Sequence, residues 1–324
     1  MDIRETIQMP IKSELLSFKQ YYARQFKSAV PLLDSALEHV GASVGKMMRP
    51  MLLLLVAKSF GEINDKSYAS ATALELLHTA SLLHDDVVDE SHIRRGVPSL
   101  NAVYSNRIAI LTGDYLFSSS LYNAALTQRS DIIEGLSQLG RILSSGEMMQ
   151  LELQQNGGFS EEKYLRVIEC KTASLFACCA RFGALSVDAA PSDVERMEQF
   201  GRLLGICFQI KDDIFDYYNS DIGKPTGSDM REGKITLPAL YVLAHSKTAE
   251  ASAINDKLQN GISLDENEIS TLIELSKSEG GVEYALRVIE RYKEQALSLL
   301  VDDIPQECRA ALVAYLHYAV SRDK

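Results

Sequence analysis

Two clusters of aspartates share the spacing Asp-Asp-x-x-Asp, and each cluster lies among apolar residues. The first occupies Asp85–Asp89 and the second Asp212–Asp216. In a helix, positions four apart lie on one face, about one turn from each other, so the outer aspartates of a cluster project side by side. Carboxylates crowded in this way repel one another unless a cation lies between them.

One such cluster alone would be equally consistent with a solvated helix face. The repetition of the spacing favours two walls of one site that binds a hard cation through oxygen. Mg²⁺ suits this site best, because proteins usually hold it with one or two carboxylates together with substrate phosphates.

Basic residues lie at four further places, each beside a glycine, a proline or the expected start of a helix. Arginine offers a two-pronged fork for phosphate, and lysine offers a point charge. Any one of them is by default a solvated surface cation, but together with the aspartates they indicate a diphosphate substrate, and their number indicates two such substrates. They are Lys46, Arg49, Arg94, Arg95, Lys171, Lys224 and Lys234.

The histidines give a weaker signal. His84-Asp85 resembles the His-Asp pair of metal phosphohydrolases, but the other histidines of such a site are not evident, which favours a structural role for His84. His78 lies two helical turns before Asp85 on the same face. It is either a packed core histidine or a contact to a bound anion, and the sequence leaves both open.

Composition narrows the function classes and the compartment. A net charge of −11 argues against a nucleic-acid partner, so local cations must recruit an anionic substrate. The five cysteines include no Cys-x-x-Cys pair, which predicts free thiols, no zinc site and a reducing cytoplasm. We expect no signal peptide at the N-terminus and no membrane-spanning segment.

The apolar pattern is helical nearly throughout, which predicts one all-α domain over residues 1–324. We expect residues 91–98 and 221–234 to be loops, and the polar stretch 246–270 to be the least constrained, with a turn at Asn260-Gly261. The expected helices follow Pro10, begin near Pro50, and span about 66–90, 104–125, 131–155, 160–187, 191–216, 280–301 and 305–321.

These motifs, taken in order, resemble those of the trans-isoprenyl diphosphate synthases of the medium- and long-chain type. The resemblance covers residues from about 45 to 240 and is compatible with the C-terminal helices at about 265–321. The matching motifs are Gly45-Lys46-x-x-Arg49-Pro50, Asp85-Asp86-x-x-Asp89 with Arg94-Arg95-Gly96, Gly113-Asp114, Lys171-Thr172, Gln209-x-x-Asp212-Asp213-x-x-Asp216 and Gly223-Lys224.

The resemblance implies an isoprenoid-synthase-type helical bundle around a deep central cavity, usually in a homodimer. It implies head-to-tail condensation of an allylic diphosphate, farnesyl or geranylgeranyl, with isopentenyl diphosphate. Three Mg²⁺ ions would be held by Asp85, Asp89 and Asp212, which with Lys171 form the expected catalytic set, while Asp86, Asp213 and Asp216 support them. The expected allylic-diphosphate residues are Arg94, Lys171, Thr172, Gln209, Lys224 and Lys234, and those for isopentenyl diphosphate are Lys46, Arg49, His78 and Arg95.

Product length in this family depends on the positions just before the first aspartate, where bulky aromatic residues close the cavity early. Here Ala80 and Ser81 are small, and Leu77 lies one turn deeper. The pattern therefore predicts a product longer than farnesyl, of the kind used for quinone side chains and delivered to a membrane. Two alternatives are a class I terpene cyclase, which usually carries a different second motif, and a non-catalytic subunit of a heteromeric synthase, which would lose one aspartate cluster.

Overall fold

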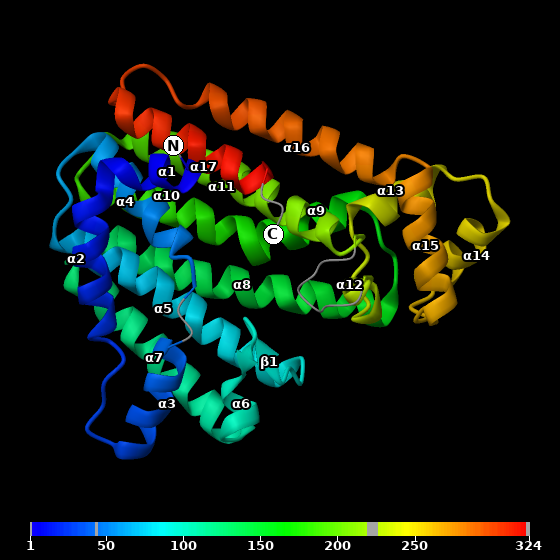
Figure 1. The fold of residues 1–324 in the computed structure, drawn as a ribbon, viewed down its shortest axis with the longest axis horizontal. Helices are drawn as coiled ribbons and strands as arrows, with labels where there is room; N and C mark the ends of the chain where they lie inside the picture. Colours follow the sequence, from blue (N-terminus) through cyan, green and yellow to red (C-terminus); the bar gives the residue numbers. More distant parts are fainter. Residues whose placement is uncertain (1, 43–44, 219–225, 322–324) are drawn as a thin grey trace. The chain divides into compact units, whose positions relative to one another are not determined.

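The computed structural model describes residues 2–42, 45–218 and 226–321, and almost all of them are helical (Figure 1). The all-α prediction is confirmed. The helices are α1 (Ile3–Gln8), η1 (Met9–Ile11), α2 (Lys12–Ala23), α3 (Pro31–Ala42), α4 (Met48–Phe60), α5 (Asp65–Val88), α6 (Leu100–Val103), α7 (Asn106–Leu126), α8 (Ser130–Asn156), α9 (Glu161–Ile168), η2 (Glu169–Ala173), α10 (Ser174–Ser186), α11 (Pro191–Phe215), α12 (Ser228–Arg231), α13 (Leu237–His245), α14 (Ala249–Gln259), α15 (Glu266–Ser278), α16 (Gly281–Ser298) and α17 (Gln306–Ser321).

The chain divides into two compact units. Unit 1 comprises residues 1–140, 178–198 and 301–315, and unit 2 comprises residues 141–177, 199–300 and 316–324. The single-domain organisation and the deep central cavity expected from the sequence stay predictions. Among the described residues, no helix is both long enough and apolar enough to cross a membrane.

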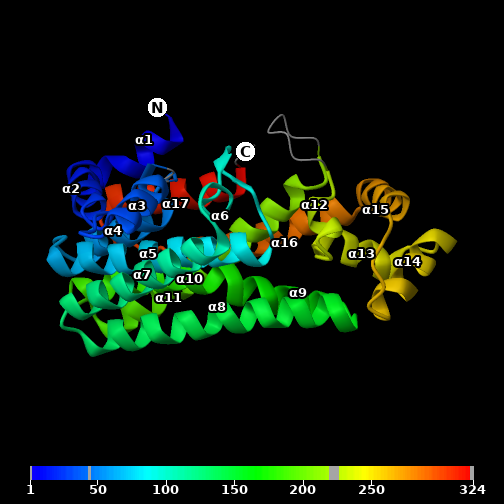
Figure 2. The same cartoon turned by 90° about the horizontal axis from the view of Figure 1, so that it is seen from below.

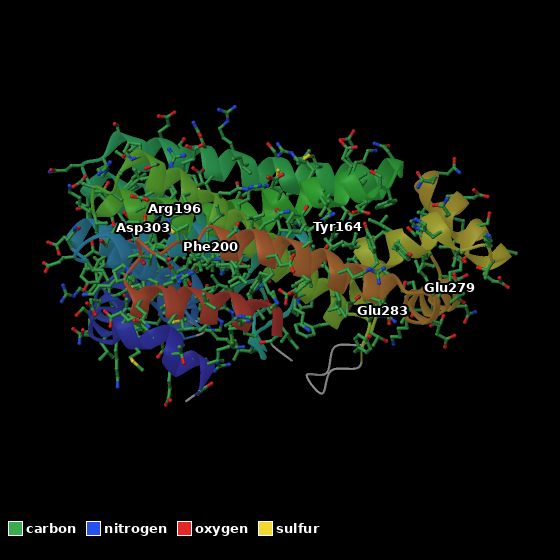
Figure 3. All side chains as sticks on the ribbon, turned by 90° about the horizontal axis from the view of Figure 1, so that it is seen from above. Tyr164, Arg196, Phe200, Glu279, Glu283 and Asp303 are labelled. Carbon is green, nitrogen blue, oxygen red and sulfur yellow. The ribbon has the colours of Figure 1, made fainter. Side chains whose placement is uncertain are left out.

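Unit 1 is built on α4 and α5. Residues 51–57 of α4 are all buried, so this helix is apolar on every side. Gly183 allows the backbones to approach, since a Cβ there would lie 2.5 Å from the carbonyl oxygen of Leu53. Arg196 on α11 forms an ion pair with Asp303 at 2.8 Å within this unit, and both are labelled in Figure 3.

The helix that carries the first aspartate cluster has clear boundaries. The Asn64 side chain accepts hydrogen bonds from the N–H groups of Lys66 and Ser67, and the Ser67 hydroxyl accepts one from the Asn64 N–H, which forms a capping box. The helix ends at Val88 rather than near residue 90, because Glu90 adopts a φ of 50° in the left-handed region.

A tight hairpin follows this helix where the sequence indicated only a loop. Strands β1 (Ile93–Arg94) and β2 (Val97–Pro98) pair antiparallel, with Arg94 opposite Val97. The two residues between them, Arg95 and Gly96, have φ values of 53° and 78°. Two successive positive φ angles are the signature of a type I′ turn, whose backbone matches the twist of paired strands.

Unit 2 contains the second aspartate cluster and a break in a predicted helix. The sequence predicts one helix over about 160–187, and its start is confirmed because the Ser160 hydroxyl accepts from the Lys163 N–H at 3.3 Å. The helix is interrupted by the π-helical turn η2, which holds Lys171 and Thr172. Single π turns within helices often occur at functional sites.

The polar stretch 246–270 is more ordered than the sequence indicated. It forms α14 and the start of α15, which lie beside α13 in Figure 2. Apolar residues on the inner faces of these helices are buried, among them Ile254, Leu258 and Ile269, whereas Ile262 between the helices is exposed. The predicted turn at Asn260-Gly261 is confirmed, with Gly261 at a φ of 68°. The expectation of a weakly constrained region is therefore wrong.

Candidate active site

The first aspartate cluster in unit 1 has two kinds of carboxylate. Asp89 caps α5, and its N–H donates to the carbonyl oxygen of Asp85 at 2.8 Å, so the predicted one-turn spacing is present. Asp85 is half-buried and Asp89 is exposed, whereas Asp86 is only 2% exposed. The outer carboxylates are thus more accessible than the middle one, and the roles expected for them as metal ligands and for Asp86 as a supporting residue stay predictions.

Arg94 is bound to the buried Asp86. Its Nε donates to Asp86 Oδ1 at 2.7 Å, and a second guanidinium nitrogen lies 2.6 Å from the same oxygen. This pair neutralises a carboxylate that would otherwise be buried alone, at considerable cost in free energy. Arg94 therefore has a structural partner besides the allylic diphosphate predicted for it.

A second group in unit 1 gathers three of the four residues predicted for isopentenyl diphosphate. Burial lowers the pKa of His78 well below its usual value, and the charges of Arg49 and Arg95 add to this effect. The Arg95 guanidinium lies against Gly45, where a Cβ would be only 2.8 Å from it. A side chain at position 45 would therefore displace the Arg95 guanidinium from its present place.

Glu75 belongs to the same group and was not predicted from the sequence. It is 5% exposed, and burial raises its pKa while the charges of Arg49 and Arg95 lower it in part. Lys46, the fourth predicted residue, is exposed. Its grouping with the others stays a prediction.

The residues predicted to set product length lie on α5, before the first aspartate cluster. Leu77 is 4% exposed and Ala80 is 1% exposed, while Ser81 is half-buried and its hydroxyl donates to the carbonyl oxygen of His78 at 2.9 Å. The structure places these side chains but does not test their role, so that role stays a prediction.

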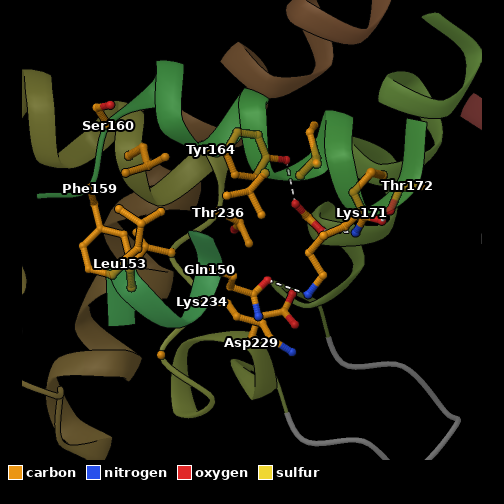
Figure 4. A pocket seen from close by; sticks show the side chains of 17 residues that line it. Gln150, Leu153, Phe159, Ser160, Tyr164, Lys171, Thr172, Asp229, Lys234 and Thr236 are labelled. Carbon is orange, nitrogen blue, oxygen red and sulfur yellow. Dashed lines mark hydrogen bonds between the residues drawn. The ribbon is translucent and has the colours of Figure 1, made fainter. Parts of the chain in front are cut away.

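Unit 2 contains a cavity of about 230 Å³ that brings together four residues predicted for the allylic diphosphate (Figure 4). These are Lys171 and Thr172 from η2, Gln209 from α11, and Lys234, which follows α12. Apolar side chains line part of the wall, among them Leu153, Phe159, Val167, Ile168 and Leu240. Lys224, the remaining predicted residue of this set, lies outside the described residues.

A chain of hydrogen bonds runs along this cavity. The Thr172 hydroxyl donates to Gln209 Oε1 at 2.7 Å, and Gln209 Nε2 donates to Asp213 Oδ1 at 2.7 Å. The hydroxyl of Tyr164 donates to Asp213 Oδ2 at 2.6 Å. Burial raises the pKa of Asp213 to about 8 and the charge of Asp229 adds to the rise, while the two hydrogen bonds oppose it.

Both lysines of the cavity have acidic partners. Lys171 forms an ion pair with Glu147, and its Nζ also donates to Gln150 Oε1 at 2.9 Å. Lys234 pairs with Glu232. These partners were missed from the sequence, as was Tyr164. The only available signal was helical spacing, since Gln150 lies one turn after Glu147 on α8.

The other two aspartates of the second cluster differ in environment. Asp212 is half-buried. Asp216 accepts hydrogen bonds from the backbone N–H groups of Ser228 at 2.9 Å and Asp229 at 3.1 Å, and from the Ser228 hydroxyl. Asp216 therefore holds the start of α12, and its expected role in supporting the metal ligands stays a prediction.

The carboxylates have the chemistry that a hard cation needs. Among the described residues, no three His, Cys, Asp or Glu side chains converge into a ready-made metal site. Mg²⁺ does not need one, because it is usually held by one or two carboxylates plus substrate phosphates. Asp86 and Asp213 accept hydrogen bonds from protein donors. The role of Asp85, Asp89 and Asp212 as metal ligands stays a prediction.

Comparisons with known proteins agree with these features. The Polyprenyl synthetase family model matches residues 30–275. A geranylgeranyl pyrophosphate synthase structure from Bacteroides thetaiotaomicron is 44% identical, with a TM-score of 0.85 and coverage of 99% of this chain and 100% of that one. A Caulobacter crescentus polyprenyl synthase, crystallised with calcium and isoprenyl diphosphate, has a TM-score of 0.90 at 30% identity, covering 99% and 98%.

A curated relative extends the similarity to a two-component enzyme. Heptaprenyl diphosphate synthase component 2 of Geobacillus stearothermophilus is 35% identical over 317 residues, which cover 97% of each chain. The family match, the shared all-α fold and the identity to these relatives lead to one conclusion. This chain belongs to the polyprenyl synthetase family of prenyltransferases.

Proposed function

We propose that this chain joins isopentenyl diphosphate head-to-tail to an allylic diphosphate, farnesyl or geranylgeranyl, and releases an all-trans polyprenyl diphosphate of medium or long chain. The observation that carries the proposal is the cavity of unit 2, which gathers Lys171, Thr172, Gln209 and Lys234. Two lysines beside polar side chains and an apolar wall suit a substrate with an anionic head and a hydrocarbon tail.

Divalent metal is part of this proposal. The Caulobacter relative binds calcium together with isoprenyl diphosphate. We infer that Asp85, Asp89 and Asp212 hold three Mg²⁺ ions, with Asp86, Asp213 and Asp216 as supporting residues. When bound, the metal neutralises charge that grows on the leaving diphosphate.

The side chains of unit 2 bind and orient the allylic substrate. Lys171 exchanges its contacts with Glu147 and Gln150 for the diphosphate, and Lys234 and Lys224 add positive charge. Positive charges fixed in place at the leaving group lower the barrier to C–O bond cleavage because they need no reorganisation during the reaction. Thr172 and Gln209 lie beside Lys171 along the cavity wall.

The basic group of unit 1 binds isopentenyl diphosphate without metal. Arg49, Arg95 and Lys46 supply charge, and the lowered pKa of His78 makes its imidazole a neutral hydrogen-bonding partner near pH 7. The isopentenyl double bond then attacks the allylic cation, and the released diphosphate accepts the proton that is lost. A strong protein base beside the cation would quench it.

The length of the product distinguishes the members of this family from one another. Similar proteins are named for products as different as geranylgeranyl and heptaprenyl diphosphate. Ala80 and Ser81 favour the longer class, of the kind used for quinone side chains and delivered to a membrane. Purified protein with isopentenyl diphosphate, farnesyl diphosphate and Mg²⁺ should yield chains longer than geranylgeranyl by mass spectrometry. Product that stops at geranylgeranyl would contradict the long-chain proposal.

We propose that the chain acts as a homodimer. Helix α7 in unit 1 exposes a row of large apolar side chains, and an apolar face of this kind on a folded protein usually contacts a partner. Light scattering after gel filtration should give twice the chain mass, and a Leu111→Glu, Tyr122→Glu variant should give the mass of one chain. The exposed residues are Ile110, Leu111, Tyr115, Leu121, Tyr122 and Leu126.

A heteromeric synthase is the second candidate, because one relative is a named component of heptaprenyl diphosphate synthase. The retention of both aspartate clusters favours a catalytic chain. Activity of the purified chain alone separates the two, since a component that needs a partner would be inactive alone. All five cysteines are free thiols, which suits the cytoplasmic location that we propose.

A further inference from the structure

Tyr164 makes a contact that the proposed reaction has not yet used. It lies on α9, whereas the aspartate that it contacts, Asp213, lies on α11. Tyr164 is 7% exposed and Asp213 is 6% exposed, so both groups are largely shielded from bulk water. The 2.6 Å hydrogen bond between them, drawn in Figure 4, joins two helices at the wall of the cavity.

The donors and acceptors of this group allow one arrangement. Asp213 accepts from Tyr164 at Oδ2 and from Gln209 Nε2 at Oδ1. An ionised carboxylate only accepts hydrogen bonds, whereas an amide has one accepting and one donating end. If the Gln209 amide were reversed, its oxygen would face Asp213 Oδ1. The ionised carboxylate would repel that oxygen, and the protonated acid would have to give up the acceptor position that Gln209 Nε2 now uses. Asp213 therefore sets the direction in which the Gln209 amide points.

The orientation of Gln209 then determines that of Thr172. With its nitrogen toward Asp213, Gln209 turns Oε1 toward Thr172, whose hydroxyl donates to it at 2.7 Å. The Thr172 oxygen keeps its lone pairs, and Gln209 keeps a second N–H. Both residues line the cavity, so the polarity of this part of its wall follows from a carboxylate that is itself held by Tyr164.

We propose that Tyr164 is a positioning residue for the allylic substrate: its hydroxyl fixes Asp213, which fixes Gln209 and, through it, Thr172. This inference rests on the proposed function, in which the cavity of unit 2 binds the allylic diphosphate. Tyr164 acts through other residues and does not itself touch the reacting atoms.

The test replaces only the hydroxyl. Tyr164→Phe keeps the ring in the core and removes the hydrogen bond to Asp213. The matched control is Tyr284→Phe, because Tyr284 also donates to a carboxylate in unit 2, that of Glu161 at 2.8 Å, and does not line the cavity. Tyr164→Phe should raise the KM of the allylic diphosphate about tenfold, the scale of a lost hydrogen bond to a charged group, and leave that of isopentenyl diphosphate unchanged.

A double-mutant cycle tests the route of the effect. If Tyr164 acts through Gln209, adding Tyr164→Phe to a Gln209→Leu variant should have little further effect on allylic KM. Unchanged kinetics in Tyr164→Phe, equal increases in both KM values, or effects that multiply in the double variant would each overturn the inference.

A binding measurement separates this inference from the proposed function. Titration calorimetry with the unreactive analogue farnesyl thiodiphosphate and Mg²⁺ should show tight binding to the wild-type protein and to Tyr284→Phe, and weaker binding to Tyr164→Phe. Tight binding to all three would overturn the role of Tyr164 while preserving the proposed function. Failure of the wild type both to bind the analogue and to turn over substrate would overturn both.

Discussion

The backbone N–H of Asp89 bonds to the carbonyl oxygen of Asp85 at 2.8 Å, although the helix that carries Asp85 ends one residue before Asp89. The two residues are therefore held one turn apart by backbone geometry and not by their side chains. Because the spacing does not depend on either carboxylate, substitution of one aspartate should leave the backbone position of the other unchanged.

Metal dependence can be tested on each aspartate cluster separately. We expect Asp85→Ala and Asp212→Ala each to lower kcat by about a hundredfold or more, the scale of losing a main electrostatic contribution to the transition state. Melting temperature should not fall, since removal of a like charge relieves repulsion. Steady-state assays with excess chelator provide the comparison, and full activity in either variant or in chelator would contradict the metal assignment.

The two diphosphate sites should separate kinetically. Arg49→Ala is expected to raise the KM of isopentenyl diphosphate more than that of the allylic substrate, because Arg49 belongs to the basic group with His78 and Arg95. The measurement is initial rate with each substrate varied in turn. Equal effects on both KM values would contradict two separate sites.

Substitution of Arg94 should change both substrate binding and stability. Arg94→Ala is expected to raise the allylic KM, and it should also lower the melting temperature because it leaves the buried Asp86 without its partner. Asp86→Asn in the same chain removes the unpaired charge and should restore most of the stability but not the allylic KM. Recovery of both by the second substitution would indicate that Arg94 is structural only.

The length of the product can be altered on α5. Ser81 is half-buried and Ala80 is 1% exposed, so a ring is more easily accommodated at Ser81. Ser81→Phe should give an active enzyme whose main product is shortened toward geranylgeranyl or farnesyl. Ala80→Phe should do the same at a cost in stability of about 1–3 kcal/mol from overpacking. A stable Ser81→Phe variant with wild-type products would contradict growth of the chain past this turn.

Close packing in unit 1 gives a stability prediction. An added methyl in Gly183→Ala would lie 2.5 Å from the backbone oxygen of Leu53, so we expect a loss of about 1–3 kcal/mol in unfolding free energy. Gly140→Ala on α8 is the control, because its nearest contact would be an ordinary 3.8 Å to Phe117. Alanine there should stabilise the helix by up to about 1 kcal/mol. Urea unfolding of both variants decides this prediction.

Local sequence patterns predicted the long helices and the aspartate clusters well, because helical periodicity and capping residues are local signals. The start at Ser160 and the spacing of Asp85 and Asp89 both follow from residues within one or two turns. The π turn at Lys171 and the type I′ hairpin at Arg95 have no equally clear signal. The first leaves the apolar period almost unchanged, and the second uses an arginine where asparagine or aspartate is usual.

Residues that act through distant partners were not predictable. Tyr164 contacts a residue 49 positions later in the chain, and Glu75 is defined by its arginine neighbours Arg49 and Arg95. In the sequence alone, a tyrosine in a helical pattern is interpreted as a core residue and a glutamate as a surface charge. Their partners become known only from the fold. The stretch 246–270 was misjudged because a few apolar residues, Ile254, Leu258 and Ile269, suffice to anchor its helices when each is buried.

In the hairpin at residues 93–98, the backbone and the side chain of Arg95 favour different residue types. Its left-handed backbone, φ 53°, costs a residue with a Cβ about 1 kcal/mol or more, and asparagine or glycine would relax it. Only arginine supplies the guanidinium that fits against Gly45. Selection for heat resistance alone should therefore replace Arg95, and the survivors should be robust proteins with poor affinity for isopentenyl diphosphate.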